Sequence, residues 1–143
     1  MNIYQISVFL ENRTGQLAEI TEILAENHVD LRAISIAETA DYGVLRIIVD
    51  EVERATGILL EHGYILSKTP VLVVAVPDAP GGLAPVLRVL AEDHIDIEYM
   101  YSLFTHLEGK AYMVFRVSQE DRFVSRLKEE GIEPETLESL GLK

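Results

Sequence analysis

Apolar and polar residues alternate in several short segments of this chain and recur at helical spacing in others. Between residues 3 and 10, Tyr4, Ile6 and Val8 fall on one face and Gln5 on the other. This alternation predicts a half-buried strand. After Gly15 the apolar residues follow a helical stripe, which predicts a helix that closes near residues 27 and 28.

The same patterns predict the remaining elements. Pro134 interrupts the last segment, which makes it the least regular strand of the pattern. We expect strands over residues 31–37, 44–49, 64–66, 71–76, 95–104, 111–117 and 132–140, and helices over residues 51–62, 81–93 and 120–130. No linker separates residues 64–66 from residues 71–76, so one unit runs directly into the next.

The second half of the chain repeats the first. A group of residues that begins with Gly15, Leu17 and Ala18 reappears at one constant spacing, beginning with Gly81, Leu83 and Ala84. Gly63 and Gly131 also correspond, but their spacing is two residues longer. We therefore expect two extra residues in a loop of the second copy, and domains over residues 1–69 and 70–143.

The order of elements in each copy is βαββαβ. Right-handed crossover connections place both helices on one face of the sheet, which gives two α+β units with antiparallel sheets. The other sheet face then needs a cover. We expect Ile34 and Ile36 to belong to that apolar face, covered by the other repeat or by another chain.

Composition narrows the possible partners. The net charge of −12 argues against nucleic acid, because phosphate binding depends on Lys and Arg, and against anionic membrane surfaces. There are no cysteines, which excludes disulfides and thiolate chemistry. No apolar run approaches a membrane span and no signal peptide is visible at Met1, so we expect a soluble, cytoplasmic protein.

The turn between the first strand and the first helix of each copy is the main candidate for chemistry. Gly15 and Gly81 let backbone N–H groups approach a ligand, and a helix N-terminus favours a carboxylate. Asn12 and Asp78 occupy equivalent positions and could hold the ammonium group of the same ligand. Alternatively, these residues form only tight turns and helix caps.

The second strand of the second copy carries Tyr99, Met100 and Tyr101, which have no aromatic counterparts in the first copy. They could line a small apolar pocket with hydroxyl donors, or they could simply fill the core. Arg13 lies beside the first loop and could pair with a ligand carboxylate; its counterpart is Ala79.

No residue pattern indicates catalysis or a metal. His28 and His94 are equivalent, but no third ligand accompanies them, and at helix ends they are expected to interact with carbonyl groups. Sequence signatures of nucleophilic hydrolases and of nucleotide-binding loops are missing. We therefore expect no enzyme, no cofactor and no metal.

The doubled motif resembles the ACT domain, a regulatory module that binds small molecules. In that family a strand leads through a short polar turn and a glycine into Leu-Ala and a helix, and a later strand begins with a hydrophobic–Asp–hydrophobic triplet. This chain has both features twice, in residues 12–18 with 29–31 and in residues 78–84 with 95–97. Nearly the whole chain is similar to tandem ACT proteins that lack an attached enzyme.

The resemblance implies ferredoxin-like units that bind a free amino acid at interfaces between ACT units. It places the contacts in the strand–helix loop and in a neighbouring second strand. The implied loop residues are Asn12, Gly15, Gln16, Leu17, Asp78, Gly81, Gly82 and Leu83, and the implied strand residues are Ile34, Ser35, Tyr99, Met100 and Tyr101. One departure from the family pattern is Thr14, where the second copy has Pro80.

Two functional hypotheses follow. In the first, the protein is an amino-acid sensor, forms a homodimer and reports occupancy to a biosynthetic enzyme or regulator. In the second, it is a regulatory subunit that acts through protein contact at the apolar sheet face around Ile34 and Ile36. Because the loops and second strands differ between the copies, we expect unequal sites, with the second copy the stronger candidate.

Overall fold

The computed structural model describes residues 2–11, 13–38, 41–104 and 107–143. It contains two compact units, each with its own hydrophobic core. We call them the N-terminal unit, which comprises Tyr4–Thr69 and Gly141–Lys143, and the C-terminal unit, which comprises Met1–Ile3 and Pro70–Leu140.

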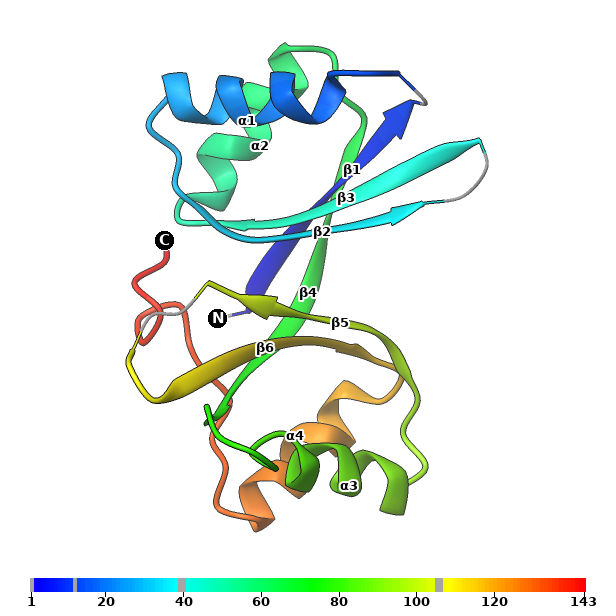
Figure 1. The fold of residues 1–143 in the computed structure, drawn as a ribbon, viewed down its shortest axis with the longest axis vertical. Helices are drawn as coiled ribbons and strands as arrows, with labels where there is room; N and C mark the ends of the chain where they lie inside the picture. Colours follow the sequence, from blue (N-terminus) through cyan, green and yellow to red (C-terminus); the bar gives the residue numbers. More distant parts are fainter. Residues whose placement is uncertain (1, 12, 39–40, 105–106) are drawn as a thin grey trace. The chain divides into compact units, whose positions relative to one another are not determined.

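The N-terminal unit is built on an antiparallel sheet (Figure 1). Strand β3 (Tyr42–Val49) lies between β1 (Ile3–Glu11) and β2 (Leu31–Glu38). The chain just before β4 (Leu66–Pro77) lies on the other side of β1, because the N–H of Phe9 donates to the carbonyl of Ile65 at 2.9 Å. These contacts place three strands and the segment that leads into β4 in one layer.

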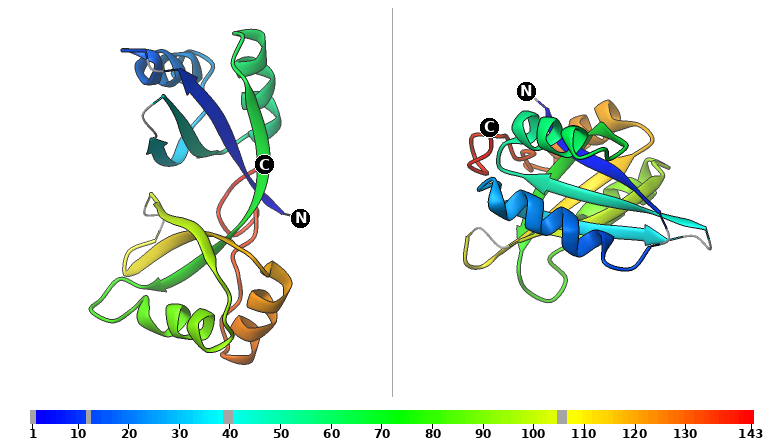
Figure 2. Two further views of the ribbon diagram at one scale, coloured as in Figure 1. Left: turned by 90° about the vertical axis from the view of Figure 1, so that its right-hand side faces the viewer. Right: turned by 90° about the horizontal axis from the view of Figure 1, so that it is seen from above.

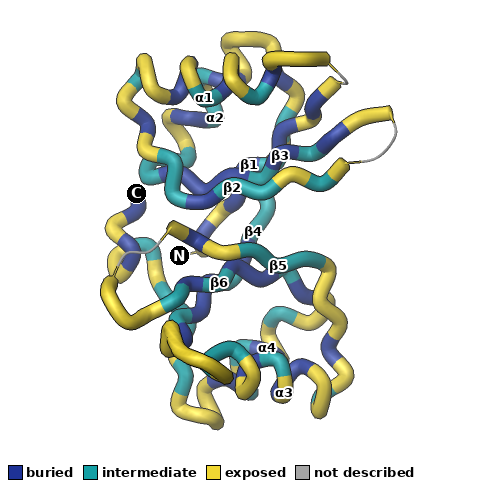
Figure 3. The backbone as a smooth tube through the Cα atoms, viewed as in Figure 1, coloured by how far each residue is buried: buried dark blue, intermediate teal, exposed yellow. Residues whose placement is uncertain are grey.

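Helices α1 (Gln16–Glu26) and α2 (Val52–Glu61) cover one face of this sheet (Figure 1). Exposed and buried residues alternate along both helices (Figure 3), as an amphipathic stripe requires. The buried stripe packs on the strand residues that face it, and the core contains Ile6, Val8, Ile20, Leu24, Leu45, Ile47, Ala55 and Leu59. Tyr4, predicted to share one face of this strand with Ile6 and Val8, is 37% exposed near the start of β1.

The expectation for Ile34 and Ile36 was wrong. Ile34 packs against the core beneath the helices. Ile36 lies two residues further along β2, on the same face because strand side chains alternate. Both residues therefore belong to the helix-covered side, and the hypothesis of a protein-contact face centred on them loses its basis.

The C-terminal unit repeats this architecture (Figure 2). Strand β6 (Lys110–Val117) pairs antiparallel with β5 (Ile97–Leu103) and with β4. Helices α3 (Ala84–Glu92) and α4 (Glu120–Glu129) cover one face, over a core in which the Phe115 and Phe123 rings meet edge to face at 5.5 Å. The prediction of two α+β units with helices on one face of antiparallel sheets is confirmed.

The elements differ from the prediction in three main places. The expected strands over residues 64–66 and 71–76 are one continuous strand, β4, which runs from Leu66 to Pro77. Helix α3 starts at Ala84 rather than at Gly81, because residues 81–83 form turns in which Gly82 donates to Ala79 and Ala84 donates to Gly81. No strand forms over residues 132–140. Instead, one hydrogen bond of 2.8 Å joins the N–H of Glu135 to the carbonyl of Val73, and Thr136 and Ser139 close a turn.

Strand register locates the two extra residues of the second copy. Ile36 lies opposite Leu45 in the N-terminal unit, and its counterpart Ser102 lies opposite Met113 in the C-terminal unit. The spacing grows by two between these paired positions, so the insertion falls in the β5–β6 connection. The expectation that it lies in a loop is confirmed.

The helices end as the sequence predicts. Gly63 and Gly131 have φ angles of 85° and 77°, in the left-handed region where glycine is favoured. His28 and His94 adopt the same conformation at φ angles of 56° and 54°, and their N–H groups donate to helix carbonyls. Of the helices in the described part of the chain, none combines the length and apolarity needed to cross a membrane.

Candidate ligand-binding pockets

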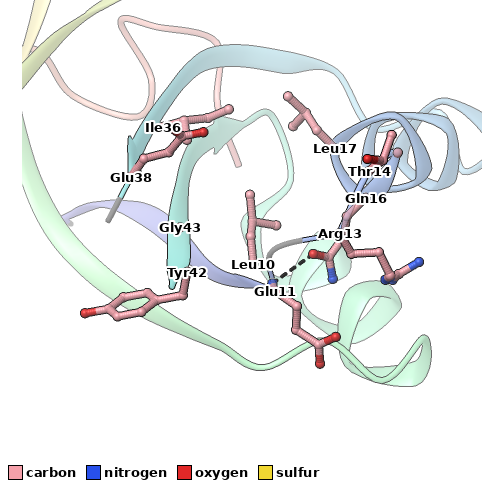
Figure 4. A pocket seen from close by; sticks show the side chains of 11 residues that line it. Leu10, Glu11, Arg13, Thr14, Gln16, Leu17, Ile36, Glu38, Tyr42 and Gly43 are labelled. Atoms are coloured by element: carbon pink, nitrogen blue, oxygen red, sulfur yellow. Dashed lines mark hydrogen bonds between the residues drawn. The ribbon is translucent and has the colours of Figure 1, made fainter. Parts of the chain in front are cut away.

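The first pocket lies in the N-terminal unit and measures about 450 Å³ (Figure 4). Three segments form it. They are the end of β1 with the loop into α1, the end of β2 and the start of β3. Its wall is apolar at Leu10, Leu17 and Ile36 and polar around the loop.

Gln16 is the most informative residue of the first pocket. The residue is 6% exposed, and its Oε1 accepts a hydrogen bond from the N–H of Glu11 at 2.9 Å (Figure 4). No group in the described part of the chain accepts a hydrogen bond from its Nε2. No buried side-chain nitrogen or oxygen in the described residues lacks a hydrogen-bond partner, so Nε2 is open to solvent. The amide is thus held by Glu11 through its oxygen and offers its nitrogen as a donor to a ligand in the pocket.

Arg13 supplies a positive charge at the same pocket. Its Nη1 lies 3.9 Å from Glu19 Oε2, and the other oxygen of Glu19 accepts a hydrogen bond from the Tyr64 hydroxyl. Burial, and then the hydrogen bond to Glu19, raise the pKa of Tyr64 to about 12. The tyrosine therefore stays protonated at neutral pH and donates its hydrogen bond to Glu19.

The second pocket lies in the C-terminal unit and measures about 520 Å³. The end of β4, the loop into α3, the start of β6 and the segment after α4 form it. Pro80, Pro85 and Val86 contribute apolar surface, and Lys110, Glu133 and Glu135 contribute charges.

The predicted site residues of the first copy fall into different places. Gly15, Gln16 and Leu17 line the first pocket. Ile34 packs in the core, and Ser35 points to the opposite face of β2. Asn12 lies outside the described residues.

The predicted residues of the second copy also separate. Gly81 and Gly82 line the second pocket, whereas the N–H of Asp78 donates to the carbonyl of Gly109 at 2.9 Å. Leu83 and Met100 pack against the core. Tyr99 and Tyr101 lie on the other face of β5, with their rings stacked at 6.4 Å. These strand residues do not line the second pocket.

Several residues that line the pockets were not predicted from the sequence. Among them are Ile36 and Tyr42 in the first pocket and Lys110 and Glu133 in the second. The strand pairing brings two of them to the loops, since Glu11 lies opposite Tyr42 and Pro77 lies opposite Lys110. Antiparallel pairing of the first and third strands of each copy could have revealed these two neighbours. Glu133 follows α4 and had no comparable signal.

The histidines lie at helix ends and contact helix carbonyl groups. His62 Nδ1 lies 2.8 Å from the carbonyl of Ile58, one turn earlier in α2. Within residues 2–11, 13–38, 41–104 and 107–143, no three His, Asp or Glu side chains are grouped to hold a metal ion.

Several solved structures share this fold. One from Bacteroides thetaiotaomicron has a TM-score of 0.89 and 38% sequence identity, over 99% of this chain and 96% of that chain. The ligand-free regulatory subunit of aspartate kinase from Thermus thermophilus has a TM-score of 0.65 and 15% identity, over 90% and 93% of the two chains. A structure of aspartokinase alpha and beta subunits has a TM-score of 0.58 and 17% identity, over 90% and 91%.

A search of curated proteins found no match. The family model described as "ACT domain pair" matches residues 1–133, which include both strand–helix loops and both pockets except Glu135. This match confirms the resemblance seen in the doubled motif. The chain belongs to the ACT domain pair family.

Proposed function

We propose that this protein is a regulatory protein that binds a free amino acid at its strand–helix loops. The observation that carries the proposal is Gln16, whose side chain lines the first pocket beside the N-terminus of α1, with its oxygen held by Glu11 and its nitrogen available to a ligand. The first four N–H groups of a helix have no partner within the helix, so the amide and the helix start together offer donors to a carboxylate.

The first pocket also offers surfaces for the other parts of an amino acid. Glu11 and Glu38 line it and could accept hydrogen bonds from an ammonium group. Leu10, Leu17 and Ile36 give an apolar wall for a side chain. A cavity of about 450 Å³ is within the size range of small-molecule sites.

Regulation would follow from ligand-dependent stability. A ligand that binds one arrangement of the protein more tightly shifts the population toward that arrangement. The Thermus thermophilus relative in fold is the regulatory subunit of an aspartate kinase, which supports a regulatory role for this architecture. We propose that a homodimer of this chain passes the ligand signal to a biosynthetic enzyme or to another regulator.

A thermal denaturation screen of the full chain with each free L-amino acid tests the proposal. A ligand present at ~100 times its Kd should add about 2.7 kcal/mol to the free energy of unfolding. Asp78→Ala and Gly81→Val change the second loop and leave the first intact. They therefore distinguish a ligand bound at the first loop from one bound at the second. If no amino acid raises the midpoint, and calorimetry shows no binding heat, the proposal is wrong.

A further inference from the structure

The two pockets occupy corresponding places in the two copies but have different linings. Correspondence follows from the repeat and from the register, since Glu11 opposite Tyr42 matches Pro77 opposite Lys110. Five polar residues at or beside the first pocket are replaced by residues without a polar side chain, each of which lines the second. The pairs are Glu11 and Pro77, Arg13 and Ala79, Gln16 and Gly82, Glu19 and Pro85, and Tyr64 and Ile132.

The hydrogen bond between the Gln16 amide and Glu11 in the first pocket has no possible equivalent in the second pocket. Pro77 has no N–H that could hold a side-chain oxygen, as the N–H of Glu11 holds Gln16. A Cβ atom at Gly82 would lie 2.0 Å from the carbonyl oxygen of Pro77, so no side chain fits at that position. The unused donor of Gln16 is therefore a feature of the first pocket alone.

The charged arrangement is also confined to the first pocket. There the Tyr64 hydroxyl donates to Glu19, and Arg13 Nη1 lies 3.9 Å from the other oxygen of Glu19. In the second pocket Ile132, Pro85 and Ala79 turn the corresponding wall into hydrocarbon surface. The same positions thus present a cation in one copy and apolar groups in the other.

We propose that the two pockets select different amino acids. The first takes one whose side chain ends in a carboxylate or carboxamide, which Arg13 binds, while the Gln16 amide and the start of α1 bind its α-carboxylate. The second takes one with a hydrocarbon side chain, which packs on Ala79, Pro85 and Ile132. The inference rests on the proposed amino-acid binding and assigns a ligand class to each pocket.

The second pocket has its own groups for the α-amino and α-carboxyl ends of a ligand. Lys110 is a cation for the carboxylate, and Glu133 and Glu135 are acceptors for the ammonium group. In this pocket the charged groups therefore lie on the strand and on the segment after α4, whereas in the first pocket Arg13 and Gln16 lie at the loop and the helix start.

Isothermal titration calorimetry of the full chain tests the assignment. The probes are L-aspartate, L-asparagine, L-glutamate and L-glutamine for the first pocket, and L-valine, L-leucine, L-isoleucine and L-methionine for the second. Gln16→Glu keeps the oxygen that accepts from Glu11 and removes the free donor. It should weaken the binding of the first-pocket probes roughly 10- to 100-fold, which corresponds to the loss of one hydrogen bond to a charged group. Arg13→Ala should weaken it in the same direction.

Lys110→Ala should weaken the binding of the second-pocket probes and leave the binding of the first-pocket probes unchanged. Lys128→Ala, an exposed change on α4 that lines neither pocket, is the control and should change neither. Arg13 and Lys110 are exposed, so their variants should fold even if Gln16→Glu does not. The inference is overturned if one amino acid fills both pockets or if each variant weakens both probes alike. If none of these probes binds the wild-type chain but another L-amino acid does, the inference fails and the proposed function stands. If no L-amino acid binds, both fail.

Discussion

At the scale of single residues, glycine has opposite effects at two kinds of position. Gly131 ends α4 with a φ angle of 77°, whereas Gly57 lies inside α2; a Cβ atom at either would meet nothing within 4 Å. Only backbone conformation therefore decides the effect of an alanine at these two positions.

We expect Gly131→Ala to lower the free energy of unfolding by about 1 kcal/mol, because alanine is strained in the left-handed region. Gly57→Ala should raise it by about 0.5–1 kcal/mol, because glycine is unfavourable inside a helix. Urea denaturation of both variants checks the signs. Equal effects at the two positions would contradict the backbone assignment.

Tyr64 makes a pH-dependent contribution to stability. Its pKa is raised from 10.0 to about 12 by burial and by Glu19, so the folded state holds the proton more tightly than the unfolded state. The resulting stabilisation is complete below pH 10 and is lost as the pH rises from 10 to 12. Stability should therefore fall in that window.

Tyr64→Phe removes the hydroxyl and its hydrogen bond, and should cost about 1 kcal/mol at neutral pH. The variant should also lose less stability than the wild-type chain between pH 10 and pH 12. Tyr4→Phe is the matched control at an exposed tyrosine. Parallel pH profiles for the wild-type chain and Tyr64→Phe would refute the role given to this hydroxyl.

Burial and helix ends were predictable from the sequence where hydrophobic periodicity determines them. Side-chain contacts that depend on tertiary structure were not. The helix stripe with Ile20 and Leu24 and the helix-ending Gly63 and Gly131 are confirmed. Gln16 was predicted only as a loop contact, because its hydrogen bond to Glu11 depends on how the loop closes. Alternation places Tyr4 on the same face as Ile6 and Val8 but does not give the extent of the cover, and Tyr4 is 37% exposed.

At the scale of elements, the turn into α3 requires a glycine that the turn into α1 does not. The carbonyl of Pro77 occupies the place of a Cβ atom at Gly82, whereas the corresponding residue Gln16 carries a long side chain.

Gly82→Ala should therefore destabilise the chain by about 2 kcal/mol, or displace the turn and abolish binding in the second pocket. Gln16→Ala should cost about 1 kcal/mol through the lost hydrogen bond to Glu11. Thermal denaturation of the two variants gives the comparison. If Gly82→Ala is the more stable of the two, the tight turn at Pro77 is wrong.

Element order was predictable because each strand and helix carries a clear period, and the order βαββαβ follows directly. The last strand, predicted over residues 132–140, does not form. Pro134 lacks an N–H, and the segment keeps only the hydrogen bond between Glu135 and Val73. The pocket linings were only partly predictable. Tyr42 and Lys110 reach the loops through strand pairing, which periodicity alone does not specify.

At the scale of the whole molecule, the duplication preserves the scaffold and varies the sites. Both copies keep the glycine before the first helix, the helix-ending residues and the apolar stripes. The pocket positions diverge, and Arg13 and Gln16 have Ala79 and Gly82 as their counterparts. Two copies of the same fold could therefore bind two different ligands in one chain.

The central claim is that this chain binds a free amino acid at the loops. Isothermal titration of the purified full chain with each L-amino acid tests it most directly. We expect saturable binding of at least one amino acid, weakened by Gln16→Glu or by Lys110→Ala but not by Lys128→Ala. An absence of binding heat with every amino acid, together with unchanged thermal midpoints, would contradict it.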